Sequence, residues 1–231
     1  MGRMTTLLDF LRTRLGRCLF LLLSLHVSAA SLADQPNILL IYVDDLGFGD
    51  LGSYGHPVIR TPNIDGLARE GMTFTNYYAP SALCSPSRAA VLTGRTPYRT
   101  GIKSWIPEDS GVFLRGEEIT LAEVLKDEGY ATALVGKWHL GVSRKQVPLA
   151  RGFDYQFGFN GAFSLYTPEK VWPRVVNHEH ESFSSQHQWN MGRYGEAAIL
   201  LNGKEVHEEQ YLTFAFRDRV MDFMEEHKDD P

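Results

Sequence analysis

The sequence predicts an α/β fold in which helices sandwich a mainly parallel sheet. The run Asn37–Val43 is almost continuously apolar, which is typical of a strand buried on both faces of a parallel sheet. Strand-like and helix-like patterns then alternate along the chain, as they do in α/β proteins. The composition, with 43% hydrophobic and 22% charged residues, is that of an ordinary globular protein.

The remaining elements are expected in the following order. Helices are predicted at 61–71, where Thr and Pro open the helix, at 87–93, at 120–129, which begins with a capping box, and at 204–228, where apolar residues fall at helical spacing. Further strands are expected at 72–78 and 130–135, and a loop at 81–86. Residues 151–202, rich in Gly, His and aromatic residues, are expected to form loops and short strands that shape a cleft.

The first 33 residues differ from the rest of the chain. A basic stretch with four Arg precedes the short apolar run Cys18–Leu23, and small residues follow up to Ala33. This order is typical of a secretory signal peptide, and the apolar run is shorter than the roughly 20 residues of a membrane span. An uncleaved membrane anchor is the alternative. We therefore expect an exported protein, in the periplasm, outside the cell or in a lumen, with no stable membrane span after cleavage.

Cleavage would change both the charge and the cysteine content. Removing residues 1–33, which carry four Arg and one Asp, shifts the formal net charge from −5 to −8. An acidic surface argues against nucleic-acid binding, which needs basic patches. Cleavage also removes Cys18 and leaves Cys84 as the only cysteine. A lone cysteine in an exported protein is buried and inert, paired with another chain, or used in chemistry.

Two acidic residues follow the first expected strand. Ligands of α/β folds gather beyond the carboxyl ends of the strands, and Asp44 and Asp45 lie at such an end. Adjacent carboxylates repel each other unless a cation lies between them, and their hard oxygens favour Ca²⁺ or Mg²⁺ over Zn²⁺. A solvated turn is the alternative, since acidic residues are common in turns.

Two further segments carry residues suited to ester chemistry. Cys84 lies just ahead of an expected helix, whose dipole stabilises an anionic nucleophile, and Arg88 can hold an anion at the same place. Lys137 and His139 follow the strand expected at 130–135 and share one side if the extended conformation continues. A fixed Lys and a proton-exchanging His suit ester hydrolysis.

Together the three segments resemble the signatures of the type I sulfatases, a formylglycine-dependent family of the alkaline-phosphatase-like superfamily. Cys84-x-Pro86-x-Arg88, continued to Arg95, resembles the first signature, and Gly129–Gly141 resembles the second. Val43-Asp44-Asp45 is similar to the first metal-binding segment of the family. The resemblance runs from Asn37 to Gly141 and implies the alkaline-phosphatase-like sulfatase fold and sulfuric ester hydrolase activity.

The resemblance also implies roles for the matched residues. A formylglycine-generating enzyme would read the motif and oxidise Cys84 to Cα-formylglycine (3-oxoalanine), whose hydrate attacks the sulfur of a sulfated small molecule or carbohydrate. Asp44, Asp45 and the modified Cys84 would bind one Ca²⁺. Arg88 would anchor the hydrate, Lys137 would contact hydrate and sulfate, and His139 would orient and deprotonate the spare hydroxyl.

The chain departs from the family pattern in one respect. The second metal-binding pair of the family and its later His and Lys have no match here, and family members are much longer. We therefore expect a truncated sequence, with a signal peptide at 1–33 and the incomplete N-terminal part of the sulfatase catalytic domain at 34–231. Such a chain is expected to be inactive and poorly stable alone.

Three other readings remain open at this point. A phosphoester or phosphonate hydrolase of the same superfamily would use the same positive site. An inactive fragment that binds sulfated glycans would keep the fold without a working site. A thiol hydrolase would use Cys84 directly, with His139 as its base.

Overall fold

The computed structural model describes residues 35–107, 109–168 and 192–229. The chain divides into two compact units, Met1–Leu40 with Pro231, and Ile41–Asp230. In the first unit the structure describes residues 35–40, which are exposed and form neither helix nor strand. The expected signal peptide at 1–33 lies outside the described residues. All elements below belong to the second unit.

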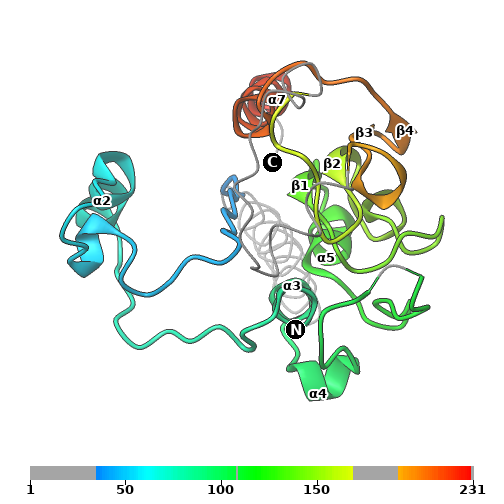
Figure 1. Ribbon diagram of the computed structural model, residues 1–231, viewed down its shortest axis with the longest axis horizontal. Helices are drawn as coiled ribbons and strands as arrows, with labels where there is room; N and C mark the ends of the chain where they lie inside the picture. The colour runs from blue at the N-terminus through cyan, green and yellow to red at the C-terminus, as the bar shows by residue number, and fades with distance from the viewer. Residues whose placement is uncertain (1–34, 108, 169–191, 230–231) are drawn as a thin grey trace, which may run out of the picture. The chain divides into compact units, whose positions relative to one another are not determined.

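A four-stranded sheet in the order β1-β2-β3-β4 forms the centre of this unit (Figure 1). The strands are β1 (Ala133–Lys137), β2 (Tyr155–Phe159), β3 (Leu200–Leu201) and β4 (Lys204–Glu205). The long pair β1–β2 is parallel, whereas β3 pairs antiparallel with both of its neighbours. Within the described residues the sheet is therefore mixed, although the pair that leads to Lys137 is parallel as expected.

Glycine permits the close approach of β1 and β2. Gly136 faces Gly158 in the register, and both have positive φ, at 119° and 147°. A Cβ on Gly158 would lie 2.0 Å from the carbonyl oxygen of Gly136. Hydrogen bonding continues beyond β1, because Trp138 N donates to Phe159 O and His139 N donates to Asn160 O, both at 3.0 Å. The Lys137–His139 segment is thus fixed by its neighbour strand.

Helix α7 and the turn η2 contact the sheet, whereas α3 contacts α4 and α5, and α2 contacts η1. A proline at the first helical position opens α2, and a complete capping box between Thr120 and Glu123 opens α5. The helices are α2 (Pro62–Glu70), α3 (Cys84–Thr93), α4 (Pro97–Thr100), α5 (Leu121–Asp127) and α7 (Leu212–Glu226), with 3₁₀ turns η1 (Gly52–Tyr54), η2 (Pro148–Ala150) and η4 (Gly195–Ala197). None of them is long and apolar enough to cross a membrane, among the residues that the structure describes.

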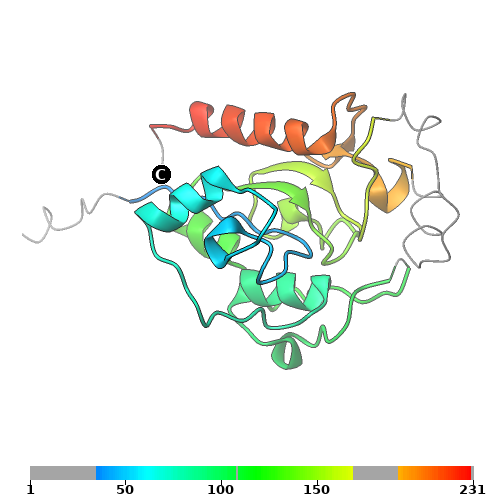
Figure 2. The same ribbon diagram turned by 60° about the vertical axis from the view of Figure 1, so that its left-hand side comes forward.

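Two buried clusters involve α3, the strands and α7. One joins α3 to the segment that follows β1 and consists of Ala89, Ile102, Ile106, Leu114, Trp138 and Leu140. The other joins β2 to α7, which runs beside the sheet (Figure 2), and consists of Phe157, Phe159, Ile199, Leu212 and Ala215. Trp138 and Phe157 are among the largest fully buried side chains. The clusters therefore fix α3 and the end of β1, which carry the residues of interest.

Several expected elements differ from the structure. The strands expected at 37–43 and 72–78 do not form, and Ile41 and Met72 are 67% and 78% exposed. An apolar run becomes a buried strand only where other elements pair with it and cover it, and the described residues do not provide that cover. The strand expected at 130–135 begins at Ala133. The helix expected at 204–228 begins at Leu212, because Lys204–Glu205 pairs with β3 as β4.

Candidate active site

Helix α3 begins at Cys84, three residues earlier than the pattern predicts. Pro86 falls in the first turn, where a helix needs no backbone N–H donor, so it is accepted inside the helix. Ser87 fixes the approach to this turn: its N–H donates to Leu83 O at 3.2 Å and its hydroxyl to Ser81 O at 2.6 Å. The half-buried thiol of Cys84 thus lies at the positive end of α3.

Two cations from distant segments converge on one carboxylate. Arg88 Nη2 lies 3.0 Å from Asp44 Oδ1, and Lys137 Nζ lies 2.8 Å from Asp44 Oδ2. Arg88 Nη1 also donates to Lys137 O at 2.9 Å, which ties α3 to the end of β1. The side chains of Arg88 and Lys137 are only 11% and 7% exposed. Three predicted site residues are therefore brought together from sequence positions up to 93 residues apart.

Asp44 is held as a carboxylate by these cations. Its burial acts to raise its pKa, but the hydrogen bond and charge of Lys137, together with those of Arg88, outweigh burial and lower the pKa below 3.8. Each cation is in turn close to an aromatic ring: the Arg88 guanidinium lies 5.3 Å from the centroid of Tyr42, and Lys137 Nζ lies 5.5 Å from that of Phe163. The sequence did not identify Tyr42 or Phe163 as a neighbour of these cations, although Phe163 falls in the aromatic stretch expected to shape a cleft.

His139 follows Lys137 and is buried. Its backbone has φ of 56°, so the extended conformation does not continue through it. Its Nε2 lies 2.9 Å from Ile106 O, which assigns the proton to Nε2, because a carbonyl can only accept. Nδ1 then carries the lone pair, and it has no hydrogen-bond partner among the described residues. Ile106 N donates to Ser85 Oγ at 3.1 Å, so the same residue contacts both His139 and the first turn of α3.

The imidazole of His139 is neutral at pH values above about 5. Burial lowers its pKa most, the hydrogen bond to Ile106 O raises it, and the charges of Lys137 and Arg88 lower it further, with Asp44 acting in the opposite direction. The resulting pKa is about 4, compared with an ordinary value of 6.5. A neutral imidazole with an unpartnered lone pair can accept a proton.

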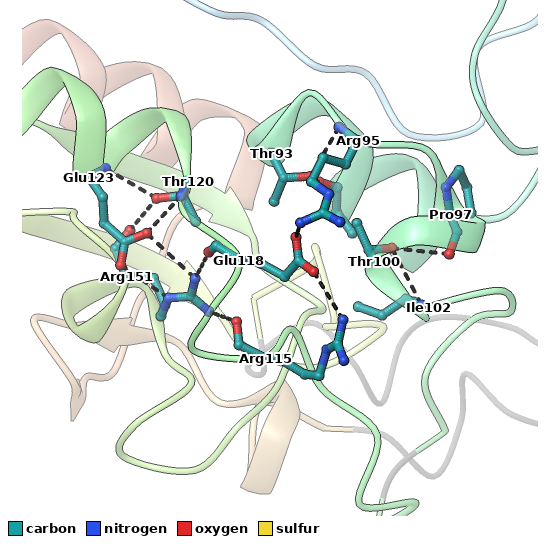
Figure 3. A network of polar contacts seen from close by, with 11 residues as sticks. Thr93, Arg95, Pro97, Thr100, Ile102, Arg115, Glu118, Thr120, Glu123 and Arg151 are labelled. Atoms are coloured by element: carbon teal, nitrogen blue, oxygen red, sulfur yellow. Dashed lines mark hydrogen bonds and ion pairs between the residues drawn. The ribbon is translucent and has the colours of Figure 1, made fainter.

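A second polar network anchors the other end of α3 (Figure 3). Glu118, whose side chain is 2% exposed, lies 2.9 Å from Arg95 Nη1 and 3.1 Å from Arg115 Nη2. Fully buried Arg151 donates to Leu114 O and Arg115 O at 3.1 Å and also to Glu118 O. Arg95, in the tail of the first signature, thus contacts Glu118 in the loop before α5. This ion pair is separate from the one between Arg88 and Asp44.

The described residues offer few donors for the Ca²⁺ that the resemblance implies. Asp45 is exposed and has φ of 56°, and Asp44 is engaged by the two cations described above. Within residues 35–107, 109–168 and 192–229, no group of three or more His, Cys, Asp or Glu side chains could hold a metal ion. Ca²⁺ takes about six to eight oxygen ligands, so the donors fit in kind but not in number.

Part of the stretch expected to shape a cleft, with His178, His180 and His187, lies outside the described residues.

The fold and these side chains define an α/β protein in which two nearly buried cations meet beside the first turns of a helix. The Sulfatase family profile matches residues 36–231. The chain therefore belongs to the sulfatase family, and its structural relatives have the alkaline-phosphatase-like sulfatase fold.

Curated relatives and solved structures agree with this assignment. Dog N-acetylgalactosamine-6-sulfatase is 38% identical over 90% of this chain and 40% of its own length, and human arylsulfatase A is 55% identical over 60% of this chain and 28% of its own. The crystal structure of Ps i-CgsB superposes with a TM-score of 0.73 at 34% identity, covering 86% of this chain and 43% of that one. The structure of BT4656 with its substrate D-glucosamine-2-N,6-O-disulfate superposes with a TM-score of 0.62 at 29% identity, covering 86% and 33%. The chain thus spans less than half the length of each of these relatives.

Proposed function

We propose that this chain contributes the nucleophile and the first cationic residues of a sulfuric ester hydrolase. The proposal rests on one observation: Arg88 and Lys137, both nearly buried, contact the carboxylate of Asp44 beside the end of β1. Two cations fixed in this way can hydrogen-bond to two oxygens of one oxyanion, such as a sulfate group. The family membership of residues 36–231 supports the same activity.

Cys84 supplies the nucleophile in this proposal. Modified to Cα-formylglycine by a formylglycine-generating enzyme, it would offer a hydrated aldehyde whose hydroxyl attacks sulfur. Its place in the first turn of α3 favours an anionic oxygen there, because the N-terminal end of the helix carries partial positive charge. Arg88, one turn further along α3, would hold that oxygen, and Lys137 would contact both it and the sulfate.

His139 would act as the base. Its Nε2 proton is committed to Ile106 O, so its free lone pair is on Nδ1. Since its pKa is about 4, the ring is neutral and its lone pair is open at neutral pH, although the same low pKa makes it a weaker base than an ordinary imidazole. Ile106 positions this ring relative to α3, because it is bonded to Ser85 as well as to His139.

Asp44, Asp45 and the modified Cys84 would provide part of the ligands of one Ca²⁺. When bound, the ion would polarise the sulfate and lower the pKa of the attacking hydroxyl. The other ligands would come from residues that correspond to the part of the relatives that this chain does not cover. Calcium binding would also require Asp44 to give up its ion pair with Arg88 or with Lys137, so that one of its oxygens can bind the metal.

The remaining parts of the proposal concern the protein around the site. We propose that residues 1–33 are a signal peptide, that 34–231 form the N-terminal part of the catalytic domain, and that the protein is exported. Its substrate would be a sulfated small molecule or carbohydrate. BT4656, whose structure contains a disulfated glucosamine substrate, is a relative that supports the carbohydrate class.

Matched nitrophenyl esters test the activity. The full-length protein that contains this chain, produced together with a formylglycine-generating enzyme, should release nitrophenol from 4-nitrophenyl sulfate. Lys137→Ala should lower the rate about 100-fold, because one fixed cation of the site is lost. Lys103→Ala is the matched control, since Lys103 is exposed and has the same 5.5 Å contact with an aromatic ring, that of Tyr98.

The same assay separates the alternatives. Faster release from 4-nitrophenyl phosphate than from the sulfate would identify a phosphoester hydrolase and overturn the proposal. Loss of activity on treatment with a thiol-alkylating agent would indicate a thiol hydrolase. Binding of sulfate esters with no release would favour the inactive glycan-binding reading.

A further inference from the structure

The loop that follows β2 carries two aromatic side chains at the cationic site. Phe163 places its ring centroid 5.5 Å from Lys137 Nζ and remains 45% exposed. Tyr166, three residues further on, is 38% exposed. Burial raises the pKa of Tyr166 most, Asp44 raises it further and Arg88 lowers it. Phe163 thus borders the cationic site, and both rings are partly exposed.

This loop is held rigidly by its neighbours. Gly161 N donates to Glu196 O at 2.8 Å, and Ser164 Oγ donates to Ala197 O at 2.7 Å. A Cβ on Gly161 would lie 2.8 Å from Glu196 Cβ, so the backbone packs directly on the η4 turn. A loop fixed on both sides of Phe163 keeps its ring in one place, which lowers the entropy lost when a ligand packs on it.

The Tyr166 end of the loop is anchored separately. Buried Arg193 donates to Leu165 O at 2.8 Å and to Tyr166 O at 3.0 Å. Leu212 N, in the first turn of α7, donates to the same Tyr166 carbonyl at 3.0 Å. The Tyr166 ring makes edge contacts with those of Tyr211 and Phe216, at 6.0 and 5.9 Å. These contacts stabilise a partly exposed ring that would otherwise be mobile.

We propose that Phe163, with Tyr166 three residues further along the same loop, forms a wall on which the ring bearing the sulfate packs, so that Phe163 is a specificity-determining residue of this site. The inference rests on the proposed function. A sulfate held by Lys137 and Arg88 is one bridging oxygen from the carbon that carries it. The ring of Phe163, whose centroid is 5.5 Å from Lys137 Nζ, is within reach of that carbon. Aromatic faces pack well on aryl rings and on the C–H faces of sugar rings.

Binding measurements test this wall without needing turnover. The full-length protein that contains this chain, with Cys84→Ala so that it cannot consume the ester, is titrated with 4-nitrophenyl sulfate, N-acetylglucosamine 6-sulfate and inorganic sulfate. Adding Phe163→Ala should weaken at least one ring ester about three- to tenfold, the effect of one lost aromatic contact, and leave inorganic sulfate unchanged. Phe163→Trp should restore binding. The ester that responds identifies the ring as aryl or sugar.

Two controls decide the outcome. Tyr98→Ala removes an 82% exposed ring with the same 5.5 Å contact to a lysine, Lys103, and should change none of the three affinities. Equal weakening of inorganic sulfate and ring esters by Phe163→Ala would overturn the inference, because the ring would then act only through Lys137. Unchanged affinity for both ring esters would overturn it as well. Failure of the wild-type full-length protein to release sulfate would count against the proposed function alone, since these affinities do not depend on turnover.

Discussion

Acid should destabilise the folded chain through His139. The folded-state pKa of this residue is about 4 and its ordinary value is 6.5. Between these pH values the unfolded chain binds a proton that the folded chain does not, so the free energy of unfolding falls as the pH falls from 6.5 to 4 and is fully present above 6.5. A difference of about 2.5 pH units corresponds to about 3 kcal/mol.

The source of this effect is specific enough to be isolated by one substitution. His139 is 3% exposed, and both Lys137 and Arg88 oppose a positive charge on it. In His139→Gln the amide can still donate to Ile106 O, but it cannot be protonated. Urea unfolding of the full-length protein that contains this chain, in metal-free buffer between pH 7 and pH 4, should therefore show a loss about 3 kcal/mol larger in the wild type than in the variant.

Two results would refute this reasoning. Parallel pH dependences in the wild type and in His139→Gln would show that another group is responsible. An NMR titration of the His139 ring with a midpoint near 6.5 would show that neither burial nor the nearby cations control it. The same titration reports the tautomer, and a proton on Nδ1 instead of Nε2 would contradict the assigned hydrogen bond to Ile106 O.

Three further predictions concern individual side chains. Thr120→Ala should lower the free energy of unfolding by about 1 kcal/mol, because it removes half of the capping box of α5; an unchanged urea midpoint would contradict this. Gly158→Ala should cost more than about 2 kcal/mol, since its Cβ would lie 2.0 Å from Gly136 O at a φ of 147°, and a normal melting temperature would argue against the β1–β2 register. Arg88→Lys should lower kcat/KM of the full-length protein about 100-fold while keeping the charge, because a single ammonium nitrogen replaces the two guanidinium nitrogens that reach Lys137 O and Asp44 separately; near-normal kinetics would show that charge alone suffices.

Local sequence signals predicted the helices around the site well. The capping box at Thr120 and the Thr61-Pro62 start both occur as expected, because caps and first-turn prolines act within one helical turn. The expected helix start at residue 87 is three residues too late, since proline is accepted in a first turn. Asp44 and Lys137 are expected on one edge of the sheet and do meet, although the strand expected before Asp44 does not form and Arg88 reaches Asp44 from α3.

Non-local structure was predicted less well. The apolar run 37–43 has the pattern of a buried strand, yet the described residues leave it unpaired. The apolar pattern indicates that this segment is suited to a strand buried on both faces. The chain spans less than half the length of the relatives above. The aromatic neighbours of the cations could not be identified singly, because Phe163 and Lys137 meet only through the β1–β2 pairing and the loop after β2.

The chemical state of Cys84 tests the central claim most directly. The protein is produced in a host that modifies a known sulfatase, and the peptide that contains Cys84 is analysed by mass spectrometry. The account predicts loss of the thiol and gain of an aldehyde that reacts with a hydrazine probe, and it predicts that Arg88→Ala reduces this conversion. An intact thiol at Cys84, with full conversion of the reference sulfatase in the same cells, would contradict the claim that this residue is the precursor of the nucleophile.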